Sequence, residues 1–372
     1  MTAPRLEIDL EKVFHNAATL VQRLGEHGIS VTGITKAMLG APELANVLLQ
    51  AGVVGLGDSR IENIEAMRRA GISAPMTLIR SPMLSQSKRV VASADVSLNT
   101  EIDVIRSLSF EAQNANVIHD VVLMIELGDL REGIMPNDLD NIVRQTLRCP
   151  NIRLTGIGAN LACRSGVSPD DRNMAELSAL AGSLEADFDV TVEVVSGGNS
   201  ANLHWAFAAD HSGRINNLRL GESILLGCEP LYRQPIEGLH TDAIAIIAEV
   251  IESKTKPSRP WGQVAQSAFT ESMPAQTSGT EAGESISQAI LAIGHQDTDP
   301  TGLHLDPGVR LLGASSDHLI VETIQGVARS GSELTMRPNY SALVRAMTSP
   351  FVAKVWKPRR TAVPRPVRHG TI

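Results

Sequence analysis

The stretch VVGLGDSRIENIEAMRRAGISAPMTLIR, residues 53–80, contains the structural unit that decides the fold. An apolar run at 53–57 precedes Asp58-Ser59, a typical helix N-cap pair, and positions 61, 64 and 67 then place apolar side chains on one helical face. A second apolar run follows at 76–80. Because two parallel strands need a helical crossover between them, the stretch predicts one βαβ unit.

The same alternation continues in both directions, from residue 31 to residue 220; Leu177, Leu180 and Leu184, for example, share the face of a later helix. The predicted strands are Val31–Lys36, Val53–Gly57, Met76–Arg80, Asp95–Asn99, Val121–Leu127, Leu154–Asn160, Val190–Ser196 and Asn217–Leu220. Eight strands with intervening helices predict a (β/α)8 TIM barrel, an α/β fold whose active site lies at the carboxyl ends of the strands. A doubly wound sheet is the alternative, but no GxGxxG motif follows the first strand.

Beyond residue 227 the pattern changes to short apolar runs separated by turns. Runs at 244–251, 290–293, 309–312 and 318–323 predict the strands of a C-terminal all-β domain. We therefore expect an N-terminal strand at 1–10 that packs with the second domain, a barrel at 11–230 and a β domain at 231–356. The polar segment 254–288 predicts a long flexible loop, and the basic, proline-containing segment 357–372 predicts a disordered tail.

Composition excludes several classes of function. Only 3 Trp, 2 Tyr and 6 Phe occur in 372 residues, which disfavours nucleic-acid sites that stack bases on aromatic rings. The formal net charge of −8 argues against binding to phosphate backbones or anionic membranes. The three cysteines lack CxxC spacing, and the charged N-terminal segment does not resemble a signal peptide. We expect a cytoplasmic protein with no nucleic-acid or membrane partner and no metal site.

Lys36 ends the first predicted strand, in VTGITKAMLG (31–40). Burial at such a position lowers the pKa of a lysine, and a neutral amine can form a Schiff base with a carbonyl compound. The alternative is a lysine whose amine simply extends into solvent. From position alone, both interpretations stay open.

A glycine-rich turn, VVSGGNSANL (194–203), follows the seventh predicted strand. Backbone N–H groups at a helix start can hold a phosphate, although such turns are also common without a ligand. The next strand end carries Arg219, Gly221 and Glu222, and phosphate sites of barrels typically follow strands seven and eight. Further polar residues at predicted strand ends are Asp58-Ser59-Arg60, Arg80, Asn99, Arg131 and Asn160.

These motifs resemble those of the pyridoxal 5'-phosphate (PLP)-dependent alanine racemase superfamily, fold type III, and within it the ornithine racemase branch. The resemblance is carried in order by PRLEIDL (4–10), GITKAMLG (33–40), GDSRIENI (57–64), GDLREGI (128–134), SGGNSANL (196–203), LRLGESILLG (218–227), AILAIGHQD (289–297), LLGASSDHLIV (311–321) and NYSALVRAMTSPFV (339–352). It therefore covers nearly the whole chain and implies a PLP-dependent amino-acid racemase.

The resemblance also implies roles for individual residues. Lys36 would hold PLP through a Schiff base, and Arg219 would face the pyridine nitrogen. Since an arginine does not give up its proton, the ring would stay neutral, which favours reprotonation of the substrate over transamination. The other residues implied in cofactor binding are Arg131, Asn160, Asn199, Ser200, Gly221 and Glu222, with Thr348 or Ser349 adding a hydroxyl from the second domain.

Racemisation needs a proton-transfer group on each face of the α-carbon, and Lys36 would serve one face. Alanine racemases use a tyrosine in a Gly-Tyr-Ala-Asp segment for the other, but the corresponding segment here is Gly294-His295-Gln296-Asp297. His295 is the natural replacement because its ordinary pKa lies near neutrality. Cys163 is a second candidate. An orienting histidine and a small buried cysteine are the alternative interpretations.

The substrate implied is ornithine or another basic amino acid. Ser316 and Asp317 would lie near it, and Asp317, Asp297 or Glu222 could meet the distal ammonium, although each could equally be a structural acid. The resemblance implies a head-to-tail homodimer, in which the second domain completes the partner's site. The alternatives are a fold type III lyase, of the decarboxylase or threonine aldolase type, and a non-catalytic PLP-binding protein.

Overall fold

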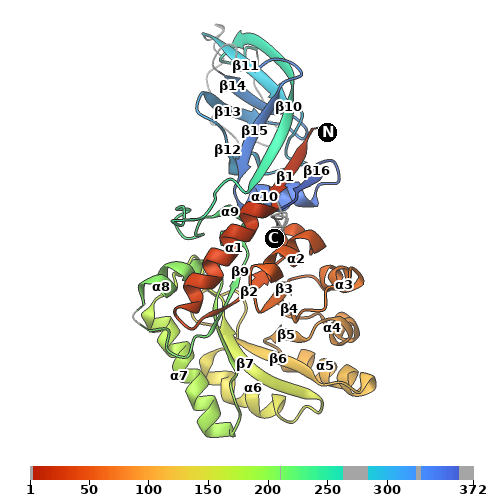
Figure 1. Ribbon diagram of the computed structural model, residues 1–372, viewed down its shortest axis with the longest axis vertical. Helices are drawn as coiled ribbons and strands as arrows, with labels where there is room; N and C mark the ends of the chain where they lie inside the picture. The colour runs from red at the N-terminus through yellow and green to blue at the C-terminus, as the bar shows by residue number, and fades with distance from the viewer. Residues whose placement is uncertain (1–2, 210, 263–283, 324–327, 360–372) are drawn as a thin grey trace, which may run out of the picture.

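The computed structural model describes residues 3–209, 211–262, 284–323 and 328–359. Figure 1 shows a barrel surrounded by helices and, beyond one end of it, a second domain made mainly of β-strands. Helix α1 (Leu10–Gly25) runs along the outside of the barrel from the junction of the two. Within the described residues, no helix is long and apolar enough to span a membrane.

Eight parallel strands close the barrel, which confirms the fold class expected from the sequence. In barrel order they are β2 (Ser30–Ile34), β3 (Gly55–Asp58), β4 (Met76–Leu78), β5 (Val96–Asn99), β6 (His119–Ile125), β7 (Ile152–Ala159), β8 (Val194–Gly198) and β9 (Asn217–Leu220). Strands β2 and β9 close the ring with Thr32 opposite Arg219. Because all strands run in one direction, their carboxyl ends meet at one mouth of the barrel.

The connecting helices alternate with these strands as the apolar periodicity predicts. They are α2 (Pro42–Gln50), α3 (Ile61–Arg69), α4 (Ser87–Ser93), α5 (Ile102–Ala115), α6 (Leu139–Thr146), α7 (Asp171–Phe188), α8 (Leu203–Ala208) and α9 (Glu222–Leu226). Each buries an apolar face, and Asp170 caps α7 by accepting from the backbone N–H of Asn173 at 2.8 Å.

The second domain is an antiparallel sheet in the order β12-β15-β10-β11-β14-β13. Its strands are β10 (Ile244–Pro257), β11 (Ser285–Leu291), β12 (Leu303–His304), β13 (Val309–Ala314), β14 (Leu319–Thr323) and β15 (Glu333–Pro338). Strand β1 (Arg5–Asp9) pairs antiparallel with β10 and parallel with β16 (Ala353–Lys357), as expected for an N-terminal strand that packs with this domain. The domain limits at residues 11, 230 and 356 stay predictions.

Three features of this domain differ from the sequence-based expectation. Strands β15 and β16 were not predicted, because their polar side chains outnumber the apolar ones that face the core. A helix, α10 (Tyr340–Thr348), packs between the domain and the barrel, with Asn339 as its N-cap. The position of α10 matters for the site because it contacts the turn that begins at Lys36.

The predicted loop and tail are shorter than expected. Strand β10 continues to Pro257 and β11 begins at Ser285, so both ends of segment 254–288 belong to the sheet, since each strand satisfies the other's backbone groups. The centre of that segment, 263–283, lies outside the described residues. Lys357 ends β16 and pairs with Glu7 at 2.5 Å, which fixes the first residue of the predicted disordered tail. Residues 360–372 lie outside the described residues.

Candidate active site

Lys36 does not end strand β2 but follows it after Thr35, and it begins a short 3-10 turn, η1 (Lys36–Met38). Its side chain is exposed in the single chain. The backbone beneath it is held by a buried pair, in which the Thr35 hydroxyl donates to Asp58 Oδ2 at 2.7 Å. Burial raises the pKa of Asp58, and the hydrogen bond from Thr35 opposes this rise. The pair thereby fixes the backbone position from which the Lys36 side chain extends.

Arg219 projects from β9 into the barrel and is almost completely buried. Its guanidinium donates to Ser196 Oγ at 2.5 Å, to the carbonyl oxygen of Ala159 at 2.7 Å and to Asn160 Oδ1 at 3.5 Å. Burial lowers its pKa to about 10, so the side chain remains a cation at neutral pH. A buried cation held by uncharged acceptors is unusual for a purely structural arginine.

Asn160 and Asn199 join the ends of β7 and β8. Asn199 Nδ2 donates to Asn160 Oδ1 at 2.8 Å and to the carbonyl oxygen of Leu161 at 2.9 Å, while its own Oδ1 accepts from the N–H of Ala201. The thiol of Cys163 accepts from both amides at 3.4 Å. Cys163 is exposed and free, so a thiol lies beside Arg219 at the barrel mouth.

The two predicted phosphate-binding turns lie side by side. Ser200 begins the 3-10 turn η4 (Ser200–Asn202), and its hydroxyl lies 3.0 Å from that of Ser223 and accepts from the N–H of Ser223 at 3.2 Å. A Cβ on Gly221 would come within 3.1 Å of Ile34, so a glycine is needed where β9 ends against β2. Two hydroxyls and two helical starts therefore converge next to Lys36, which is a favourable environment for a phosphate.

Glu222 interacts electrostatically with Lys36. Burial raises the pKa of Glu222, whereas Arg233, which donates a hydrogen bond to it, and Lys36 both oppose the rise. Arg233 lies in a turn whose backbone N–H groups at Leu231, Tyr232 and Gln234 donate to the Glu229 carboxylate. Glu222 is thus a partly compensated negative charge at the barrel mouth.

Asp129 links the two loops that carry Arg131 and Cys163. Its carboxylate accepts from four backbone N–H groups of the second loop, at 2.9–3.4 Å, from residues 163, 164, 165 and 167. Burial alone would raise the pKa of Asp129, but these N–H groups hold it below its ordinary value. Arg131 itself donates to the neighbouring Glu132 and is exposed.

Thr348 and Ser349, the two residues that the resemblance implies from the second domain, both make hydrogen bonds within that domain. The Thr348 hydroxyl donates to carbonyl groups of its own helix, and the Ser349 hydroxyl donates to the buried Asp297 at 3.0 Å. Asp297 also accepts from the N–H of Gly294, so it stabilises a turn inside the second domain. These three side chains therefore make local hydrogen bonds within the second domain, and a role for Thr348 or Ser349 toward the cofactor stays a prediction.

Tyr340, which the sequence did not indicate, lies near the barrel mouth. It begins α10, is half-buried, and interacts electrostatically with Glu222, Cys163 and Asp58. Burial and these negative charges raise its pKa, so the phenol stays protonated and can donate a hydrogen bond. The scarcity of tyrosine in the sequence was the available signal, because Tyr340 is one of only 2 in the chain.

His295, Ser316 and Asp317 lie together at one end of the second domain. The N–H of His295 donates to the Ser315 carbonyl, and that of Gln296 donates to the Ser316 carbonyl. Asp317 accepts from the Ser316 hydroxyl at 3.1 Å and lies 2.7 Å from His318 Nδ1. The hydrogen bonds described for Ser316 and Asp317 stay within this domain.

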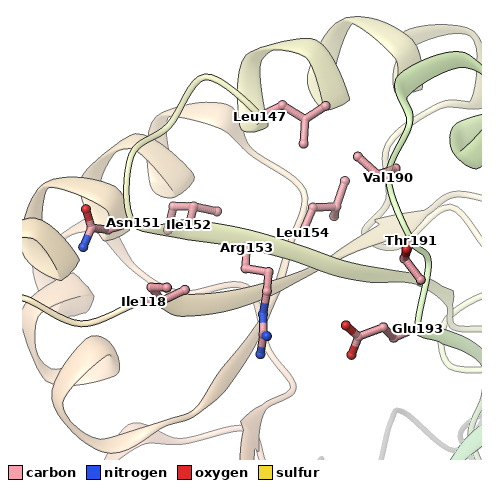
Figure 2. A pocket seen from close by; sticks show the side chains of 9 residues that line it. All are labelled: Ile118, Leu147, Asn151, Ile152, Arg153, Leu154, Val190, Thr191 and Glu193. Atoms are coloured by element: carbon pink, nitrogen blue, oxygen red, sulfur yellow. The ribbon is translucent and has the colours of Figure 1, made fainter.

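A hollow of about 530 Å3 lies at the opposite end of the barrel, where β7 begins. Figure 2 shows that Arg153 and Glu193 extend toward the same space, above which Leu154 and Val190 lie close to each other. Arg153 is already paired with Asp120 at 2.6 Å. Because barrel active sites are built from the carboxyl ends of strands, we assign the site to the Lys36 mouth. Among the described residues, no group of three His, Cys, Asp or Glu side chains could hold a metal ion.

Sequence comparison identifies relatives of this chain. A family profile described as "Alanine racemase, N-terminal domain" matches residues 8–230. The chain is 35% identical to an ornithine racemase of Acetoanaerobium sticklandii over 94% of this chain and 99% of that protein. It is also 35% identical to a lysine racemase of Thermotoga maritima, over 96% and 99% of the two chains.

Solved structures share the architecture. An alanine racemase of Streptomyces lavendulae superposes with a TM-score of 0.74 at 17% identity, over 97% of this chain and 99% of that chain. A D-threonine aldolase of Filomicrobium marinum gives 0.72 at 18% identity, over 93% and 89%. At these identities the likeness concerns the fold alone. The family match and the two full-length relatives carry the assignment, and the chain belongs to the alanine racemase family, a family of isomerases.

Proposed function

We propose that the chain is a PLP-dependent racemase of ornithine or another basic amino acid. The observation that carries the proposal is the arrangement at one barrel mouth of an exposed lysine amine, two hydroxyls at helical starts and a buried guanidinium. This donor set fits PLP, which presents an aldehyde, a phosphate and a ring nitrogen. The full-length relatives that act on ornithine and on lysine support the substrate class.

The residues of this chain would divide the binding work. Lys36 would bind the aldehyde carbon, and Ser200, Ser223 and the N–H groups of η4 and α9 would hold the phosphate. Tyr340 would add a hydrogen bond from α10. When bound, PLP draws electrons from the α-carbon of an amino acid and makes its proton removable.

Proton transfer would need a group on each side of the substrate. The Lys36 amine would hold the proton on one side after the substrate has displaced it. His295 of a second subunit is our candidate for the other side, and Cys163 of the same subunit is the rival. The turn at 294–297 lies at the end of the second domain together with Ser316 and Asp317, which supports a head-to-tail homodimer.

Recognition of a basic side chain requires a carboxylate near the amine site. Glu222 and the partner's Asp317 are the candidates, and Glu222 is already within charge interaction of Lys36. Arg233 neutralises Glu222 in the single chain, so a distal ammonium group would compete with Arg233 for this carboxylate.

A lyase of the threonine aldolase type shares the fold, so the reaction must be tested directly. The purified protein is incubated with each common amino acid, and the products are separated by chiral chromatography. We expect ornithine or lysine of one hand to yield the other hand, with a yellow protein. Lys36→Ala should lose both the colour and the turnover. Release of glycine or of a decarboxylated amine, or full turnover by Lys36→Ala, would overturn the proposal.

A further inference from the structure

The buried guanidinium of Arg219 rests on a chain of hydrogen bonds that descends through the barrel interior. Arg219 donates to Ser196 Oγ at 2.5 Å, and the Ser196 hydroxyl donates to Asn217 Oδ1 at 2.8 Å. Asn217 Nδ2 then donates to Ser30 Oγ and Thr32 Oγ1, each at 3.1 Å. All of these residues line a cavity of about 260 Å3 inside the barrel.

The donor-to-acceptor direction of this series of hydrogen bonds is fixed by Ser30, at the end farthest from Arg219. Ser30 Oγ donates to the backbone carbonyl of Asn216 at 2.8 Å, which leaves its lone pair for Asn217 Nδ2. The amide of Asn217 therefore presents its oxygen to Ser196. Since the single hydrogen of the Ser196 hydroxyl is used on Asn217, its lone pair faces Arg219. A guanidinium has donors only, so this is the polarity that it requires.

The acceptors that the structure describes for Arg219 are all uncharged. Neutral acceptors hold a buried cation only if their dipoles are oriented toward it, because the site lacks the screening of water. Loss of the Ser196 acceptor, or of the amide that orients it, would free the guanidinium to turn or to move away from the barrel axis.

On the basis of the proposed function, we propose that Ser196 and Asn217 are positioning residues that hold Arg219 toward the ring nitrogen of the cofactor. They act through Arg219 and do not touch the substrate. By keeping the guanidinium cationic and in place, they favour return of a proton to the α-carbon over its transfer to the cofactor's aldehyde carbon. The hydrogen bonds through Ser196 and Asn217 would thus set how many racemisation events occur for each conversion of the cofactor to its pyridoxamine form.

Four variants test this role. Ser196→Ala removes the acceptor, and Asn217→Leu removes the group that orients it. Asn217→Asp keeps an acceptor for Ser196. The Thr32 hydroxyl can donate to its second oxygen, and the Ser30 hydroxyl can turn from the Asn216 carbonyl to do the same, so this variant should restore the placement of Arg219. Thr155→Val is the matched control, because Thr155 lines the same cavity but donates only to the Val121 carbonyl.

The first measurement uses the protein without cofactor. The side-chain ¹⁵N signals of Arg219, assigned with Arg219→Lys, report whether its guanidinium hydrogens are protected from exchange. We expect protection in the wild type, Thr155→Val and Asn217→Asp, and roughly tenfold faster exchange in Ser196→Ala and Asn217→Leu. Equal protection in all variants would show that Ser196 and Asn217 do not position Arg219, whether or not the protein is a racemase.

The second measurement uses the loaded enzyme and counts racemisation events per conversion of the cofactor to its pyridoxamine form. The ratio should fall roughly tenfold in Ser196→Ala and Asn217→Leu and stay within about twofold of wild type in the other two variants. A ratio that falls in Arg219→Lys but not in Ser196→Ala would overturn the positioning role while leaving the proposed function intact. A wild type that binds no PLP would refute the proposed function instead.

Discussion

Asn199 Nδ2 lies 2.8 Å from Asn160 Oδ1, and this hydrogen bond ties the end of β8 to the end of β7 directly beside Arg219. The same Asn199 caps the turn that begins at Ser200. One side chain therefore sets the spacing between Arg219, which we propose faces the ring nitrogen of the cofactor, and the turn that we propose binds its phosphate. Its two functions can be separated by substitution.

Asn199→Asp should keep the cap and lose the cross-strand bond, because a carboxylate accepts but does not donate. We expect the free energy of unfolding of the cofactor-free protein to fall by about 1–3 kcal/mol and PLP affinity to fall by roughly tenfold or more. Chemical unfolding and absorbance titration measure these. Asn141→Asp, at an exposed amide whose oxygen accepts from Gln145, is the control. Equal stability of the two variants would contradict the prediction.

Asp129→Asn should loosen the loop that carries Cys163, because an NH2 group would face N–H donors. We expect faster amide hydrogen exchange at residues 164–167 and a lower kcat, with a cost of about 1–3 kcal/mol. The pKa of Asp129 is lowered in the folded protein, so its stabilisation is present above the unfolded pKa and is lost as pH falls through the folded pKa. Asp140→Asn, on the exposed start of α6, should change neither exchange nor kcat.

His119 should make the fold sensitive to moderate acid. It is buried beside the Ser97 hydroxyl at 2.8 Å, and burial lowers its pKa from 6.5 to about 4. The unfolded chain binds a proton below about pH 6.5 while the folded chain does not, so stability falls as pH falls from 6.5 toward 4, by roughly 3 kcal/mol. Guanidinium unfolding at several pH values measures this slope. His119→Gln should show a shallower slope over the same interval; an identical slope would contradict the assignment.

Arg233→Ala should move the acid limb of the pH–kcat/KM profile to higher pH. The pKa of Glu222 is raised by burial, and Arg233 opposes that rise, so loss of the guanidinium lets the pKa rise further. Glu222 would then be protonated at a higher pH and lose its attraction for a basic substrate. Tyr232→Phe, in the same turn, is the control. An unmoved acid limb would show that Glu222 does not bind substrate.

His295→Ala and Cys163→Ala should differ in one direction of α-proton exchange. Loss of a proton-transfer group lowers the rate by about 10²–10⁴-fold. If His295 serves the face opposite Lys36, exchange from one enantiomer should slow by this amount while exchange from the other persists. Deuterium incorporation from D2O, followed separately for the L and D substrates, measures both. The same pattern in Cys163→Ala, with normal exchange in His295→Ala, would assign the second transfer to Cys163.

Much of the barrel site was predictable from local patterns. Lys36, Asn160, Asn199 and Arg219 follow or end short apolar runs, and strand alternation alone indicates that such ends meet at one mouth. The second domain was less predictable, since β15 and β16 mix charged and apolar residues and register with their neighbours decides whether they form.

By itself the sequence determined the closed barrel and the β-rich second domain, because periodicity and strand-end polarity are local properties of the chain. The resemblance of its motifs indicated the family and pointed to Lys36 and Arg219. Tertiary structure alone decided that Tyr340 interacts electrostatically with Glu222, Cys163 and Asp58, and that Asp297 accepts from Ser349 and supports a turn. It also decided that Arg219 is hydrogen-bonded to Ser196, and Ser196 to Asn217, since these contacts depend on the pairing of β2, β8 and β9. Contacts between residues distant in sequence are set by strand register and packing, and a single sequence does not contain them in readable form.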